Sequence, residues 1–156
     1  MNSETSSKAN SFLRSVILSD FVVSLCCLGM LFPYTLTLCK ILQSPLCDLV
    51  AALQHANLII KTIEDVRQNI HAKFAELFKN AQNLLSTVNE EMKITRITSR
   101  QEHRANYNTK DLETYFRITI MIPLLYYLID QLQSKFQNHK ATLSSLNNLI
   151  PLNFIF

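Results

Sequence analysis

The acidic and histidine residues of this chain lack the spacing that acid–base or metal chemistry requires. Adjacent carboxylates occur at 64–65 and 90–91, and neighbouring side chains on a helix point about 100° apart, so neither pair can face one substrate. His55 and His71 have no carboxylate at ligand spacing. We therefore expect solvated surface carboxylates and packing or surface histidines, with no catalytic residues, no metal site and no cofactor.

The four cysteines also lack the spacing of a zinc or redox site. Cys26 and Cys27 are adjacent, Cys39 and Cys47 are isolated, and no pair has the C-x-x-C spacing. Cysteines within apolar helical stretches are usually small buried hydrophobic residues. We expect free thiols, as in proteins of a reducing nuclear or cytoplasmic compartment.

A single glycine in 156 residues excludes several classes of functional loop. Phosphate-binding loops, dinucleotide-binding turns and nucleophile elbows need glycine where the backbone meets a ligand closely or adopts positive φ. Composition is otherwise that of one globular domain, with 48% hydrophobic residues and a formal net charge of +3. A charge this small does not by itself indicate a nucleic-acid partner.

A basic segment at 93–110 is the best candidate for a functional surface. Its arginines recur every fourth residue, so even a transient helix would align them, and aromatic residues follow closely. Arginines with nearby aromatic rings can neutralise phosphates and stack on bases. The DNA-contact candidates are Arg96, Arg100, Arg104, Arg117 and Tyr115. The alternative is an ordinary solvated loop whose arginines pair with glutamates or helix carboxyl ends.

Apolar residues recur at alternating steps of three and four from residue 46 to residue 88. No glycine or proline interrupts this stretch, which predicts one helix, or two collinear helices, of about forty residues. Arg67 occupies one expected apolar position. Such a helix needs other helices or a partner chain to cover its seam. The seam residues are Leu46, Leu49, Leu53, Ile60, Ile63, Ile70, Leu77 and Leu84.

The remaining elements predict an all-α fold, an elongated helical bundle built around that coiled-coil-like helix. We expect a disordered N-terminus at 1–11, a helical domain at 12–152 with the basic loop at 93–110, and a truncated tail at 153–156. Pro33 should kink or end the first helix, and Pro123 should kink a helix from Leu112 to about His139. Asp111 or Thr109 can cap that last helix.

A nineteen-residue stretch without charge, at 21–39, is long enough to cross a bilayer. Asp20 borders it, Pro33 interrupts it, and four hydroxyl side chains dilute it. The residues before it also lack a basic signal-peptide region. Two buried helices that meet near Pro33 are the better interpretation, with a membrane anchor as the weaker alternative.

Three segments in order carry a family resemblance: KILQSPLCDLVAALQHANLIIKTIEDVR, RITSRQEHRANYN and YFRITIMIPLLYYLIDQLQSKFQNHK. Together they resemble the helical middle of hAT-superfamily transposase-like proteins of animals, most closely the zinc-finger MYM-type and THAP-type repressor relatives. The resemblance covers 12–152. Its matching residues are Leu42, Gln43, Asp48, Leu49, Val50, Ala52, Arg100, Arg104, Asn106, Tyr115, Phe116, Arg117, Ile122, Pro123, Leu124, Gln131, Leu132, Phe136 and His139.

The resemblance implies a helical insertion within an RNase H-like fold, whose metal-binding acids and dimerisation segment would lie outside residues 1–156. It also implies a transposon-derived, nuclear protein. Two departures weaken the match: the chain has no tryptophan, and position 126 is tyrosine where relatives often have aspartate.

The leading hypothesis is a non-catalytic helical fragment of a hAT transposase-like protein, with roles in assembly and auxiliary DNA contact. Its partners would be the remaining transposase-like domains, DNA, or a second copy. The alternative is a stand-alone helical module that dimerises through the 46–88 seam, or, with less support, a small membrane protein anchored by 21–39. The location would be nuclear, with cytoplasmic as the alternative.

Overall fold

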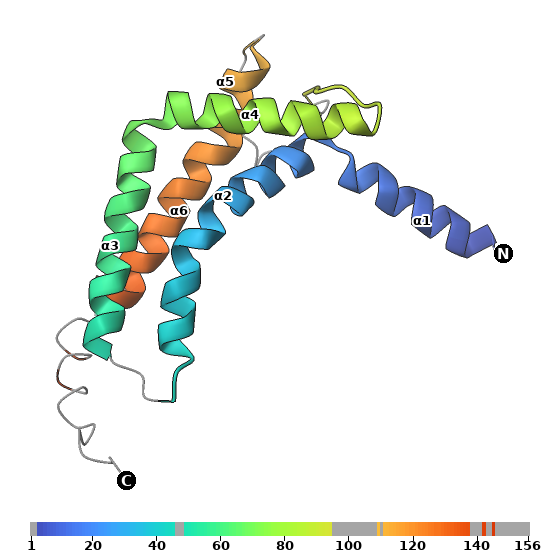
Figure 1. Cartoon of the computed structure of the whole chain (residues 1–156). Coiled ribbons are helices and arrows are strands. Elements are labelled where there is room, and N and C mark those ends of the chain that lie inside the picture. Colours follow the sequence, from blue (N-terminus) through green and yellow to red (C-terminus); the bar gives the residue numbers. More distant parts are fainter. Residues whose placement is uncertain are drawn as a thin grey trace. The chain divides into compact units, whose positions relative to one another are not determined.

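The all-α prediction is confirmed, because every regular element that the structure describes is a helix. The computed structural model describes residues 3–45, 49–94, 109, 111–137, 142 and 145. The first four helices are α1 (Ser3–Val16), α2 (Ser19–Leu42), α3 (Leu49–Gln68) and α4 (Ile70–Thr87) (Figure 1). A last helical run comprises α5 (Leu112–Phe116), the π-helical turn η1 (Arg117–Met121), α6 (Ile122–Leu132) and the π-helical turn η2 (Gln133–Gln137).

The contacts within the chain divide it into two compact units, and the helical domain expected at 12–152 stays a prediction. One unit contains the described parts of 1–30 and 69–124, and the other contains those of 31–68 and 125–156. Two helices, α2 and α6, contribute residues to both units.

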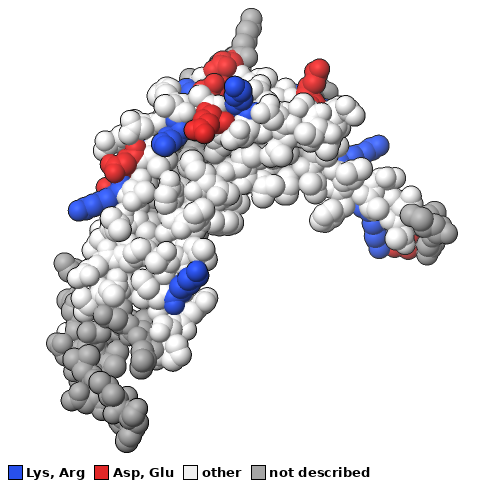
Figure 2. Space-filling model, viewed as in Figure 1, with Lys and Arg blue, Asp and Glu red and all other residues white. Residues whose placement is uncertain are grey.

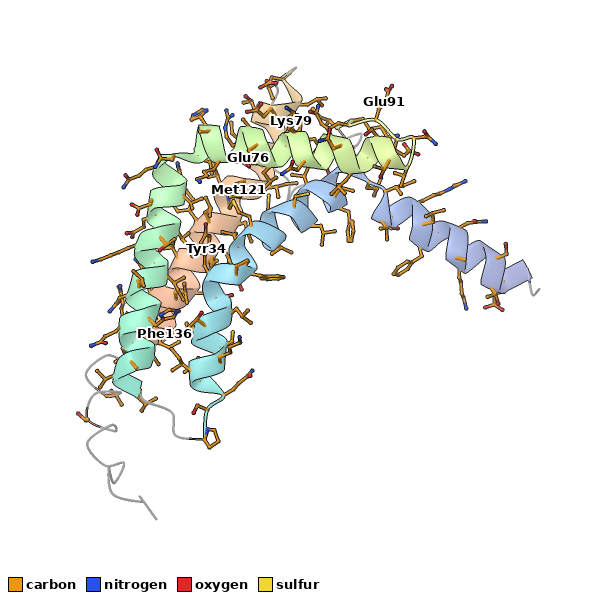
Figure 3. All side chains as sticks on the ribbon, in the orientation of Figure 1. Tyr34, Glu76, Lys79, Glu91, Met121 and Phe136 are labelled. Atoms are coloured by element: carbon orange, nitrogen blue, oxygen red, sulfur yellow. The ribbon has the colours of Figure 1, made fainter. Side chains whose placement is uncertain are left out.

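In the first unit, aromatic side chains of α4 and α5 form the centre of the core. Phe74 and Phe78 have ring centroids 6.1 Å apart, and Phe78 lies 6.3 Å from Phe116. Tyr115 meets Phe116 edge to face at 5.2 Å, an arrangement that the ring quadrupoles favour. Met121 of η1 is also fully buried (Figure 3).

In the second unit, the buried face of α3 supplies most of the core. Its buried residues recur at helical spacing: Ala52, Leu53, Ala56, Ile59, Ile60, Ile63 and Val66. The turn η2, which includes Phe136 (Figure 3), packs against α3, and Gln137 Nε2 donates to Asn57 Oδ1 at 3.2 Å. Leu125 and Leu132 of α6 are buried in the same unit.

The N-terminus differs from the prediction of disorder at 1–11, because Ser3 to Ser11 belong to α1. No proline or glycine occurs in α1, and Lys8 Nζ lies 2.7 Å from Glu4 Oε1, an i, i+4 ion pair that supports the helix. Its apolar residues Phe12 and Leu13 are exposed.

The helix α2 continues through Pro33, so the predicted pair of helices meeting near that residue is wrong. Proline deprives the carbonyl four residues earlier, that of Gly29, of its usual donor. Gly29 is exposed, so water can reach this carbonyl and the helix need not end.

The stretch 46–88, predicted as one helix or two collinear helices, contains two helices, α3 and α4, separated by Asn69. The backbone of Asn69 (φ −99°, ψ 25°) leaves the helical region, and its carbonyl accepts from Lys73 N at 3.2 Å as the first bond of α4. Asparagine competes with helix formation because its short amide binds nearby backbone groups. An unbroken apolar repeat alone could not reveal this end.

The last helix confirms the prediction from Leu112 as far as Gln137, and it contains two π-helical turns. The turn η1 ends at Met121, two residues before Pro123, and Ile122 N–H donates to Arg117 O, one residue further back than in an α-helix. A π-helical turn is one way to accommodate a proline within a helix. The helix start is capped as predicted: Thr114 N donates to Asp111 Oδ2 at 2.9 Å, and Asp111 N donates to Thr109 Oγ1 at 3.1 Å.

Candidate functional site

The basic segment is only partly within the described residues. Arg96, Arg100 and Arg104 lie outside them, so their DNA contact stays a prediction. Lys93 and Ile94 follow α4 without regular structure, and Lys93 N donates to the buried Ser19 Oγ at 3.0 Å. This bond attaches the beginning of the segment to the first residue of α2.

The other two DNA-contact candidates are buried. Tyr115 is 3% exposed and packs edge to face on Phe116. Arg117 is 9% exposed; its guanidinium lies 3.4 Å from Glu113 Oε1 and donates to Thr114 Oγ1 at 3.1 Å. In this arrangement Tyr115 and Arg117 contribute to packing, and neither is presented to a phosphate backbone. Nearness in the sequence grouped them with the loop arginines, and it could not distinguish a buried from an exposed side chain.

Most of the predicted seam is buried within the chain itself. Leu53, Ile60, Ile63, Ile70 and Leu77 are buried, Leu49 is half-buried, and Leu46 lies outside the described residues. Leu84 is a correction: it is 50% exposed, and its neighbour Leu85 is 1% exposed. The buried face of α4 follows the predicted repeat through Ile70, Phe74, Leu77 and Ala81 and then takes a step of four to Leu85, where the repeat expected a step of three to Leu84. A seam covered by its own chain leaves little of it for a second copy.

The sequence did not predict a contact between α3 and α6 in the second unit. Arg67 Nη2 donates to Tyr126 Oη at 3.0 Å, and the guanidinium carbon lies 5.0 Å from the Tyr126 ring centroid. Arg67 Nε is buried and has no hydrogen-bond partner among the described residues. The signals in the sequence were an arginine at an apolar position and a tyrosine where relatives often have aspartate, and nothing linked the two.

Of the described histidines, His71 is exposed and His55 is half-buried. Glu64 and Asp65 are exposed, and Lys93 Nζ lies 3.3 Å from Glu90 Oε2. Among the residues that the structure describes, no three His, Cys, Asp or Glu side chains gather as metal ligands would.

The described cysteines are free thiols in three different environments. Cys27 is buried, Cys26 is half-buried and Cys39 is exposed, contrary to the expectation of burial for Cys39. Burial raises the pKa of the Cys27 thiol to about 12, and the neighbouring Cys26 adds to the shift. Burial also raises the pKa of Cys26. Neither thiol is therefore activated as a nucleophile.

The helix α2 carries an exposed apolar surface that sequence reasoning missed. Its only charged residues are Asp20 and Lys40, and in Figure 2 the surface over its middle is free of charged side chains. By length and composition, α2 and the run Leu112–Gln137 could each cross a membrane, and 28% of the most apolar window of each is buried. The apolar side chains of α2 thus point both into the protein and outward.

The comparisons with known proteins show a distant relationship. About 97% of the chain aligns with the human protein named 52 kDa repressor of the inhibitor of the protein kinase, at 25% identity over 161 residues. The mouse protein of the same name aligns over the same share at 24% identity. In each case the chain spans 21% of the relative's length. No family model and no solved structure matches. The chain is therefore distantly related to a segment that makes up about one fifth of a protein named as a repressor.

Proposed function

We propose that this chain is a non-catalytic helical module of a hAT transposase-like, transposon-derived regulatory protein. The observation that carries the proposal is the alignment of nearly the whole chain with one fifth of a protein named as a repressor and not as an enzyme. The three ordered segments of the resemblance lie within that alignment, and the described residues have the all-helical structure expected of such an insertion.

Assembly with other protein domains is the role that the exposed side chains favour. Large apolar residues are exposed on both α1 and α2, among them Phe12, Leu25 and Phe32. Contiguous exposed apolar surface on a soluble protein usually marks an interaction site. To test a regulatory role, the chain is fused to a heterologous DNA-binding domain and the output of a nuclear reporter gene is measured. Repression is expected; unchanged output together with exclusion from the nucleus would contradict the proposal.

Auxiliary DNA contact is proposed for Arg96, Arg100 and Arg104. Fluorescence anisotropy with duplex DNA over a salt series tests it, using a variant with these three arginines changed to alanine. Each lost phosphate contact should lower the slope of log affinity against log salt by about 0.9. The matched control changes Lys61, Lys73 and Lys79, all exposed on α3 and α4, to alanine and so removes the same charge. Equal effects of both variants would refute a specific contact.

The non-catalytic part of the proposal has a direct test. Purified protein is incubated with duplex and hairpin DNA in magnesium and then in manganese, and the products are separated on denaturing gels. We expect intact DNA. Cleavage or strand joining that follows the protein through purification would overturn this part.

Membrane anchoring remains the second candidate because of the length and apolar composition of α2 and of Leu112–Gln137. Sodium carbonate extraction of cells that express the chain distinguishes the two candidates. Release into the supernatant is expected for the regulatory module, whereas resistance to extraction would support an anchor.

A further inference from the structure

The helix α1 buries none of its described side chains. Ser6 is half-buried and the others are exposed. Six of its fourteen residues are serine or threonine, which are poorer helix formers than alanine. A helix of this length without tertiary packing is only marginally stable in water. The backbone of α1 can therefore unfold locally at a low free-energy cost and become extended.

Ser11, near the middle of α1, has a basic residue three positions away on each side. Lys8 precedes it, Arg14 follows it, and Phe12 is the residue directly after it. Both Ser11 and Phe12 are exposed. Kinases with an acidic substrate cleft select serines that have basic neighbours, because the carboxylates of the cleft pair with them. An apolar residue directly after the serine can fill a hydrophobic pocket of such a cleft.

No other described serine has basic residues at both of these positions. Ser7 has Glu4 three residues before it, and an acidic cleft would repel this carboxylate. Ser15 has one basic neighbour, the adjacent Arg14, and its Oγ donates to Ser11 O at 3.0 Å. Ser11 and Arg14 also line the same polar surface groove. Sequence and exposure thus distinguish Ser11 from the other serines of α1.

We propose that Ser11 is a phosphorylation site for a basophilic serine kinase. In the transfer, the Ser11 hydroxyl oxygen forms a bond to the γ-phosphorus of ATP, and the bond from that phosphorus to the departing ADP oxygen breaks. The hydroxyl proton passes to the catalytic aspartate of the kinase. Local unfolding of α1 supplies the extended stretch that the kinase cleft binds. The site does not depend on the DNA contact or the regulatory role proposed above.

Lys8 and Arg14 also stabilise the product when α1 forms again. Residues three positions apart are neighbours on a helix, so both cations can pair with the phosphate, whose charge is about −1.5 to −2. Lys8 Nζ lies 2.7 Å from Glu4 Oε1, and the phosphate competes with this carboxylate for it. Because Glu4, Lys8 and Arg14 are the charged residues of α1, phosphorylation reverses the sign of its net charge.

Phosphorylation of the whole chain with ATP tests the site. The probes are the purified catalytic domains of a cyclic-AMP-dependent, a diacylglycerol-dependent and a calmodulin-dependent kinase. Trypsin cleaves after Lys8 and Arg14, and Ser11 is the one hydroxyl residue of the resulting peptide 9–14. We expect mass spectrometry to find phosphate on this peptide with at least one of the kinases, and none in a Ser11→Ala variant. An unmodified peptide with all of them would overturn the proposal.

A variant with Lys8→Gln and Arg14→Gln tests recognition by charge. It should lower kcat/KM for phosphorylation of Ser11 at least tenfold, because the cleft carboxylates lose both partners. The matched control, Lys61→Gln with Lys73→Gln, removes the same charge from exposed positions of α3 and α4 and should react like wild type. Circular dichroism confirms that both variants keep their helical content. Equal rates for wild type and the first variant would contradict a basophilic site.

Discussion

Arg67 and Tyr126 join α3 to α6 by two interactions of one guanidinium. The guanidinium donates a 3.0 Å hydrogen bond to the tyrosine hydroxyl, and its carbon lies 5.0 Å from the ring centroid. Both residues belong to the same compact unit. The contact accounts for an arginine at a position where the helical repeat calls for an apolar residue.

We expect Tyr126→Phe to lower the free energy of unfolding by about 0.5 kcal/mol, since it removes a hydrogen bond from a partly exposed pair. Tyr126→Ala should lose a further 0.5–1 kcal/mol or so, because the cation–π contact is lost as well. Tyr126→Asp offers Arg67 a carboxylate and should be more stable than the alanine variant. Urea denaturation measures all three, with Tyr127→Phe on the neighbouring exposed tyrosine as the control. An alanine variant as stable as wild type would show that the contact contributes nothing.

The register of α4 can be tested by truncating two adjacent leucines. Leu85→Ala should lower the free energy of unfolding by roughly 2–4 kcal/mol, because Leu85 is 1% exposed and its removal leaves a cavity. Leu84→Ala, at a half-exposed site, should cost less than about 1 kcal/mol. Chemical denaturation of both variants gives the comparison. The reverse order would place Leu84 in the core, as the 46–88 repeat predicted, and would contradict the burial of Leu85.

The cap of α5 makes stability depend on pH. Hydrogen bonds from Thr114 hold the pKa of the Asp111 carboxyl below its usual value. The stabilisation is therefore complete above the unfolded-state pKa of about 4, and it is lost as the pH falls toward the lower folded-state pKa. Asp111→Asn should lower the urea midpoint at pH 7, and the difference from wild type should shrink by pH 3.

A second variant distinguishes charge from capping. Asp111→Ala has no side-chain acceptor, whereas asparagine remains a good cap. The alanine variant should therefore be less stable than the asparagine variant at every pH. If the difference in urea midpoint between wild type and Asp111→Asn stayed constant from pH 7 to pH 3, the ionised carboxylate would be excluded as the source of the stabilisation.

The thiols should react with a disulfide reagent in the order of their exposure. At pH 8 the Cys27 thiol, with a pKa of about 12, holds only about one thiolate in ten thousand and is also buried. In variants that keep a single cysteine, Cys27 should react at least about a hundredfold more slowly than Cys39, and urea should abolish most of the difference. Equal native rates would show that Cys27 is not buried.

Helix formation in this chain was predictable from local chemistry. Three local features predicted the helices: the rarity of glycine, the apolar repeats and the acidic cap at Asp111. Each depends on residues only a few positions apart, so each can be recognised in the sequence. The burial of Leu53, Ile60, Ile63, Ile70 and Leu77 followed from the same spacing. The family resemblance also came from sequence alone, and the distant match to a repressor supports it.

Which side chains of each helix face the core could be learned only from the tertiary structure. Spacing places Arg117 on a helix but does not say whether Glu113 and neighbouring side chains will enclose it, and it cannot tell that Leu85 and not Leu84 faces the core. The predicted repeat holds on α4 as far as Ala81 and fails only at the end of the helix, where Leu85 is buried. On α2, buried and exposed side chains are alike apolar in sequence. Packing between residues that are distant along the chain decides that Val23, Cys27 and Leu31 are buried while Phe21, Leu25 and Phe32 stay exposed.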